Sequence, residues 1–171
     1  GIYLLFGGSV LTMKNIFKIK STLPVLLILV FLTGCGTDPA LSRFKTQVDD
    51  FCTRISELDT SINNIDTQSE GYTSELLGYL DELDAEFQAF SEVDFPEQFD
   101  YLESLADEAG EYMTEAVKSY HEAYSNGSYN GYTADYALQN YSRAYKRIQI
   151  ILTFLHGEEP DDADLSIEYG E

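Results

Sequence analysis

Hydrophobic residues recur along most of the chain at alternating spacings of three and four positions. Four such series run through residues 40–65, 68–91, 96–125 and 133–156. This spacing places the apolar side chains of each series on one helix face, and no segment shows the sustained alternation of a half-buried strand. The pattern predicts an all-α fold, an antiparallel up-down-up-down four-helix bundle.

Turn-forming residues mark most of the helix ends. Pro96 suits the first turn of a helix, and residues 126–131 form a turn cluster of Asn, Gly, Ser and one Tyr between the third and fourth series. We expect Thr133 to cap the last helix and Gly157 to take the left-handed conformation that follows a helix end. These residues place the second and third connections and the end of the last helix.

The boundary between the first two series is the weakest. Their heptad phase is nearly continuous, so residues 40–91 could form one rod of ~78 Å in a three-helix arrangement. Asn63 and Asn64 suit a helix end, and Thr67–Glu70 has the pattern of a capping box. A rod would also extend beyond the later helices and leave apolar surface uncovered. We therefore favour a hairpin over the fused helix.

The amino-terminal region has the pattern of a secretory signal. Residues 1–12 contain no Met, and we interpret them as translation upstream of Met13. Residues 13–34 contain three lysines, then an apolar run, then small residues, which is the order found in signal peptides. The apolar run Leu23–Leu32 is too short to cross a bilayer, which takes roughly 20 apolar residues.

The sequence Leu32-Thr33-Gly34-Cys35 resembles the lipobox of bacterial lipoproteins. The resemblance implies cleavage between Gly34 and Cys35, a covalent diacylglyceryl lipid on the Cys35 sulfur, and anchoring on the extracytoplasmic face of the cell membrane. Residues 35–39 would then link the anchor to the first helix. The whole chain is similar to the small, uncharacterised helical lipoproteins of Gram-positive bacteria, a likeness that implies anchoring and a helical fold but no activity.

The composition is strongly acidic, with 30 Asp and Glu against 10 Lys and Arg and a formal net charge of −20. Phosphate binding needs clustered basic residues, so we expect no nucleic acid partner. Residues 158–171 contain seven acids, which predicts a solvated, disordered tail after a bundle domain at residues 40–157. Arg143, Lys146 and Arg147 are expected to form exposed ion pairs with neighbouring helices.

Few residues carry candidate chemistry. The chain has two histidines and lacks HExxH, Gly-x-Ser-x-Gly and Walker patterns, so we expect no enzyme. Residues 55–117 contain 18 acids and no Lys or Arg, and carboxylates such as Asp81, Glu82, Asp84 and Glu86 could hold a divalent cation. No EF-hand loop is present, so we favour solvated helix faces and assign no metal ligand and no cofactor besides the lipid. Cys52 is expected at the edge of the core.

Tyrosine is the unusual residue type, because nine of the 13 tyrosines fall between residues 101 and 145. In the predicted topology the first and third connections meet at the end far from Cys35, whereas the second returns to the membrane side. Four tyrosines flank the third connection and could contact a protein, peptide or glycan: Tyr124, Tyr129, Tyr132 and Tyr136. The alternative is that tyrosines fill the core seam, since Tyr120, Tyr141 and Tyr145 lie on or beside an apolar stripe.

Two functions are compatible with these sequence features. The first is a lipid-anchored binding or scaffold module at the cell surface, which contacts its partner through the far loops. The alternative is a lipoprotein that binds a small ligand or a divalent cation.

Overall fold

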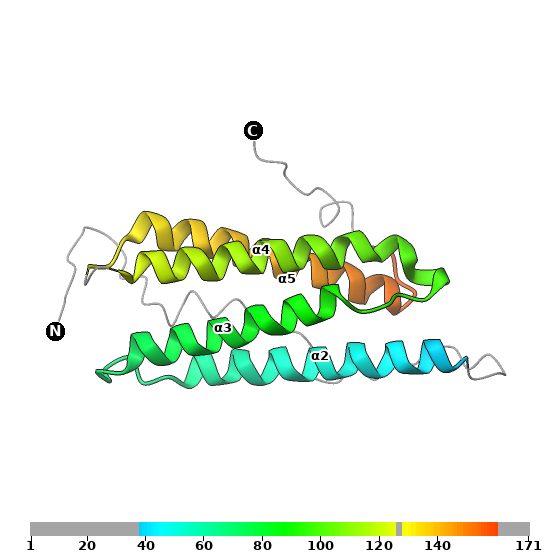
Figure 1. The fold of residues 1–171 in the computed structure, drawn as a ribbon, viewed down its shortest axis with the longest axis horizontal. Coiled ribbons are helices and arrows are strands. Elements are labelled where there is room, and N and C mark those ends of the chain that lie inside the picture. The colour runs from blue at the N-terminus through cyan, green and yellow to red at the C-terminus, as the bar shows by residue number, and fades with distance from the viewer. Residues whose placement is uncertain (1–37, 126–127, 161–171) are drawn as a thin grey trace.

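The computed structural model describes residues 38–125 and 128–160 (Figure 1). Within these ranges the chain forms helices and no strand. The elements are α2 (Pro39–Asn64), α3 (Tyr72–Ser91), the short 3-10 helix η1 (Glu97–Leu102), α4 (Glu103–Ala123) and α5 (Gly131–Leu155). The four α-helices pack as antiparallel neighbours along a common axis. The predicted all-α bundle is confirmed, and the fused first helix is wrong.

The break between α2 and α3 comes from local hydrogen bonding. Ile65 has an extended backbone (φ −60°, ψ 133°), which ends α2. The Asp66 carboxylate then accepts a hydrogen bond from the amide of Gln68 at 2.9 Å. This turn replaces the predicted capping box at Thr67–Glu70, and α3 begins at Tyr72 rather than at residue 68. The hairpin is therefore correct, but its mechanism differs from the prediction.

The later boundaries also differ in detail. The third helix begins as η1 before it continues as α4, and α4 ends at Ala123. Asn130, not Thr133, caps α5, because its side-chain oxygen accepts a hydrogen bond from the amide of Thr133 at 3.3 Å. Gly157 has φ 73°, as predicted for the residue that follows a helix end.

The core is formed by one apolar face of each helix. Phe51 of α2 stacks on Phe90 of α3, with ring centroids 4.2 Å apart. Small residues on α4 and α5 let the backbones of these two helices approach most closely. The backbones of α3 and α4 approach less closely, and those of α2 and α3 least closely of the three pairs. Full burial stabilises each large apolar side chain by about 1.5–3 kcal/mol. The largest of these buried side chains are Phe44, Ile55, Leu58, Leu76, Leu80, Leu83, Phe87, Leu102, Met113, Tyr120 and Ile148.

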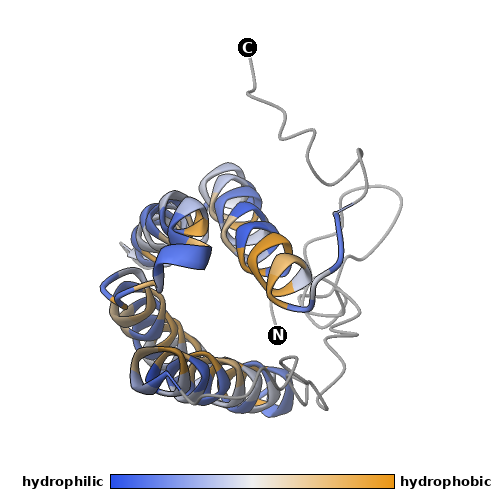
Figure 2. Ribbon diagram, turned by 90° about the vertical axis from the view of Figure 1, so that its right-hand side faces the viewer, coloured by the Kyte–Doolittle hydropathy of each residue, from blue (hydrophilic) through white to orange (hydrophobic). Residues whose placement is uncertain are grey.

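The helices follow one another around an arc when the bundle is viewed end-on (Figure 2). Chain neighbours pack on each other, so α2 and α5 lie at the two ends of the series of pairings. Side chains nevertheless join them, because Tyr141 and Tyr145 of α5 both donate hydrogen bonds to Asp59 of α2. This bridge connects the first helix to the last.

The connections sit at opposite ends of the bundle. The α2–α3 and α4–α5 connections lie together at one end, which we call the tip, as the sequence predicts (Figure 1). The start of α2, the α3–η1 connection and the end of α5 lie at the other end, which we call the base. Phe95 packs on Phe44 there, with ring centroids 4.8 Å apart. None of the described helices is both long enough and apolar enough to cross a membrane.

Candidate functional site

Exposed tyrosines gather at the tip. In the described part of the chain four large hydrophobic side chains are exposed, and three of them belong to the start of α5 or the residues just before it: Tyr129 (48%), Tyr132 (92%) and Tyr136 (47%). Tyr124 is half-buried, and its ring lies 5.3 Å from that of Tyr129. All four tyrosines predicted as partner contacts therefore lie at this end.

The start of α5 sets how these side chains are presented. Because the Asn130 cap begins the helix at Gly131, Tyr132 and Tyr136 fall one turn apart on its outer face. Ala134 and Ala137, which lie between and beyond them, face the core. The cap thus places two exposed tyrosines one helical turn apart.

A second layer of tyrosines supports the exposed ones. Tyr120 is buried in the core, and Tyr72 of α3 and Tyr124 of α4 are half-buried. Burial, followed by the proximity of neighbouring phenols, raises the pKa of each of these three groups. Burial and then the charge of Asp135 raise the pKa of Tyr129. These tyrosines therefore stay neutral at physiological pH.

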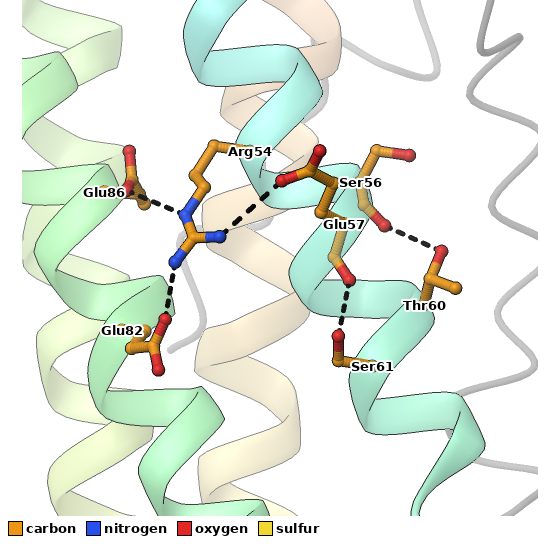
Figure 3. Close-up of polar contacts among 7 residues, drawn as sticks. All are labelled: Arg54, Ser56, Glu57, Thr60, Ser61, Glu82 and Glu86. Atoms are coloured by element: carbon orange, nitrogen blue, oxygen red, sulfur yellow. Dashed lines mark hydrogen bonds and ion pairs between the residues drawn. The ribbon is translucent and has the colours of Figure 1, made fainter.

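A surface groove of about 480 Å³ runs between α2 and α3. Phe51, Phe90 and Val93 form its apolar floor, and charged side chains form its rim. Arg54 occupies the rim and contacts three carboxylates: Glu82 at 2.6 Å, Glu86 at 3.4 Å and Glu57 at 3.6 Å (Figure 3). Since these ion pairs are largely exposed, each adds little stability. Arg54 is the only basic residue among the described residues that line the groove, and these three carboxylates already pair with it.

Asp59 is a partly buried carboxylate that the sequence patterns did not single out. Its Oδ1 accepts hydrogen bonds from the hydroxyls of Tyr141 at 2.8 Å and Tyr145 at 2.9 Å. Burial raises the pKa of Asp59, although the two hydrogen bonds act in the opposite direction. Tyr141 and Tyr145 were correctly expected in or beside the apolar seam, but nothing in the local sequence indicates their shared acceptor.

Arg147 corrects another expectation. Its side chain is 1% exposed, so it does not form a surface ion pair. Nε donates to Glu108 at 2.9 Å, and the guanidinium lies 4.5 Å from the ring centre of Tyr112. Nη2 is buried without a hydrogen-bond partner among the described residues. Arg143 donates to Asn140 at 3.3 Å and lies 5.7 Å from the same Tyr112 ring.

The acidic side chains on α3 contact side chains of the neighbouring helices. The structure contains no group of three or more potential metal ligands within residues 38–125 and 128–160. Each carboxylate named above as a potential cation ligand contacts another side chain instead. The pairs are Asp81 with His121, Glu82 and Glu86 with Arg54, and Asp84 with Thr114. This face holds α3 to its two neighbours.

The remaining sequence predictions fall at the ends of the chain. Cys35, Gly34 and all of residues 1–37 lie outside the described residues, as does most of the acidic tail, residues 161–171. Cys52 is half-buried against the core, as expected, and burial followed by the charge of Asp49 raises its pKa to about 11. Comparisons with protein-family models, curated proteins and solved structures found no match to this chain.

Proposed function

We propose that the protein is a lipid-anchored, extracytoplasmic helical bundle that serves as a binding or scaffold module at the cell surface. The observation that carries this proposal is the separation of its two ends. Helix α2 begins at Pro39 at the base, a few residues after Cys35, whereas three of the four exposed tyrosines of the described chain lie at the tip. A lipid on Cys35 would hold the base at the membrane and present the tip outward.

The chemistry of the tip supports contact with a macromolecule. Tyrosine offers a large contact area and loses little conformational entropy, and it is enriched among residues that dominate binding energy. Tyr129, Tyr132 and Tyr136 expose this area, while the half-buried Tyr124 supports it from below. Tyr132 and Tyr136 are held on the first turns of α5, and Tyr129 lies just before it.

Carriage of a small ligand or divalent cation has less support. The partly buried carboxylate of Asp59 already accepts two tyrosine hydroxyls, and Arg54 on the rim of the groove between α2 and α3 already pairs with the neighbouring carboxylates. Neither feature leaves a set of inward polar groups converging on an empty space. The tip is the better candidate for the binding surface.

The anchor is tested by metabolic labelling with radioactive palmitate and mass spectrometry of the mature amino terminus. The wild-type chain should incorporate label and begin at an acylated Cys35, whereas Cys35→Ala should incorporate none and lose membrane retention. A wild-type chain that is released with an unmodified thiol would contradict the anchor.

The tip is tested by chemical cross-linking on intact cells. A Tyr129→Ala/Tyr132→Ala double variant should fold normally, because both side chains are exposed, yet lose cross-linked partners. Tyr101→Ala is the matched control, since Tyr101 is 56% exposed but lies in η1 at the base. Loss of the same cross-links in both variants, or in neither, would reject the tip as the contact.

A further inference from the structure

We propose that the tip binds a basic segment of another protein, in which an arginine or lysine side chain lies against the exposed tyrosine rings. This inference rests on the proposed function and adds the chemical class of the partner. It follows from three features of the tip: the accessible rings, the surrounding charge and carboxylates that no cation of the described chain occupies.

The first feature is the pair of rings on α5. Tyr132 is almost fully exposed and Tyr136 half exposed, and they lie one helical turn apart. A cation over the face of such a ring is attracted by its quadrupole, and arginine is the residue that most often makes this contact. The bundle itself contains the interaction, because Arg143 and Arg147 both lie within 5.7 Å of the centre of the Tyr112 ring. The tip offers the same ring type, exposed to solvent.

The second feature is charge. The two stretches that form the tip, residues 64–76 and 119–139, contain five acids and no Lys or Arg. Asp135 lies on α5 between Tyr132 and Tyr136 in sequence, close enough to Tyr129 for its charge to act on that phenol. An acidic partner would be repelled by this surface and by the net charge of the whole chain, whereas a basic partner would be attracted and steered to it.

The third feature separates the tip from the acidic groove between α2 and α3. The groove between α2 and α3 also combines aromatic residues with carboxylates, but Arg54 already contacts Glu82, Glu86 and Glu57 there. An incoming cation would have to compete with Arg54. In contrast, Glu70, Glu122 and Asp135 form no ion pair within the part of the chain that the structure describes. Their charge is available to a partner.

The test uses the full chain in uncharged detergent micelles and a fluorescent peptide of alternating glycine and arginine. Fluorescence anisotropy should show saturable binding that weakens as salt is raised, and a peptide with glutamate in place of arginine should not bind. Tyr132→Leu/Tyr136→Leu keeps apolar bulk but removes the rings, and it should weaken binding by at least about fivefold. Tyr101→Leu, at the base, should leave the affinity unchanged, and circular dichroism checks that both variants fold.

Three results would overturn the inference. Equal affinity of the tip variant and the wild type would mean that the peptide responds only to overall charge. Binding that strengthens in Arg54→Ala and ignores Tyr132 and Tyr136 would place the cation in the groove. Binding of the glutamate peptide or of a neutral glycan in place of the arginine peptide would identify a different partner chemistry. If cell-surface cross-links depend on the tip but the arginine peptide does not bind, the proposed function stands and only this inference fails.

Discussion

Asp59 bridges α2 and α5, and we predict that replacing its carboxylate with the neutral amide of Asn changes the stability of the bundle differently from removing the side chain. Asp59→Asn keeps an oxygen that can accept from Tyr141 and Tyr145 but removes a partly buried negative charge. Since burial outweighs the two hydrogen bonds in setting the pKa of Asp59, we expect Asp59→Asn to be neutral or stabilising at neutral pH. Asp59→Ala removes the acceptor altogether, and we expect it to destabilise.

The magnitude follows from the hydroxyls. Tyr141 is buried, so losing the Asp59 acceptor weakens its hydrogen bonding inside the bundle, which costs about 1–3 kcal/mol. Tyr145 loses the same acceptor, and because its side chain is only half-buried it adds less to this loss. Tyr141→Phe removes a hydroxyl together with its need for an acceptor, and it should cost about 1 kcal/mol or less because Asp59 retains Tyr145.

The pH dependence gives the sharper assay. Folding raises the pKa of Asp59 above its ordinary value of 3.8, so folding favours the protonated form. The resulting stabilisation is complete below pH 3.8 and is lost as the pH rises through the folded-state pKa. The advantage of Asp59→Asn over the wild type should therefore grow as the pH rises from 3.8 through the folded-state pKa of Asp59 and then level off, measured by urea unfolding. The other carboxylates titrate in both proteins, so their contribution cancels when the two unfolding free energies are subtracted.

One clear outcome would refute this account of Asp59. If Asp59→Asn lost more than about 1.5 kcal/mol at neutral pH, the hydrogen bonds to the charged carboxylate would outweigh its burial. A difference that became more favourable to the wild type with rising pH would contradict the direction of the pKa shift in the same way.

The remaining predictions concern stability and reactivity. Glu108→Ala should cost about 2–3 kcal/mol in urea unfolding, because it leaves the buried Arg147 without a carboxylate; the 38% exposure of Glu108 keeps the loss below that of a fully buried pair. Arg147→Met should change stability by less than about 1 kcal/mol, since it removes the unpartnered Nη2 as well as the charge. Gly78→Ala should stabilise α3 by about 0.5–1 kcal/mol, because Gly78 is exposed in mid-helix and nothing lies within 4 Å of the added Cβ. Alkylation of Cys52 should be slow at neutral pH and rise as the pH approaches its pKa of about 11 or as urea unfolds the chain, followed by intact mass.

Each of these predictions has a contrary result. Equal losses in Glu108→Ala and Arg147→Met would mean that the pair stabilises through packing alone. A destabilising Gly78→Ala would indicate that α3 is strained at this point, and rapid labelling of native Cys52 would show an accessible thiolate.

The helices could be predicted because their signal is local and repeated. The apolar residues from Leu76 to Phe90 recur on one face, and the helical period alone places them in the core. The helix starts were predicted less well, because Asp66 and Asn130 form hydrogen bonds with the backbone that compete with the expected caps at Thr67 and Thr133.

The candidate surface could be predicted from local patterns, but the polar interior could not. Tyr129 lies within the turn cluster at residues 126–131 and Tyr132 directly follows it, which placed both at the tip, and the apolar stripe placed Tyr120 and Tyr141 in the core. The bond between Asp59 and Tyr141 joins residues 82 positions apart, so no local pattern indicates it. Arg147, one position before Ile148, sits at the edge of the stripe, where the period does not decide between water and the interior.

The order of helix pairing has a mechanical consequence. If the base is tethered and a partner pulls on the tip, the load enters through α4 and α5 and leaves through the start of α2. The force then runs parallel to the helix axes and shears α2 along α3. In this geometry all contacts between α2 and α3 bear the load at once. Because the Asp59 bridge also ties α2 to α5, the rate at which this seam and the bridge break together would set how long a strained attachment lasts.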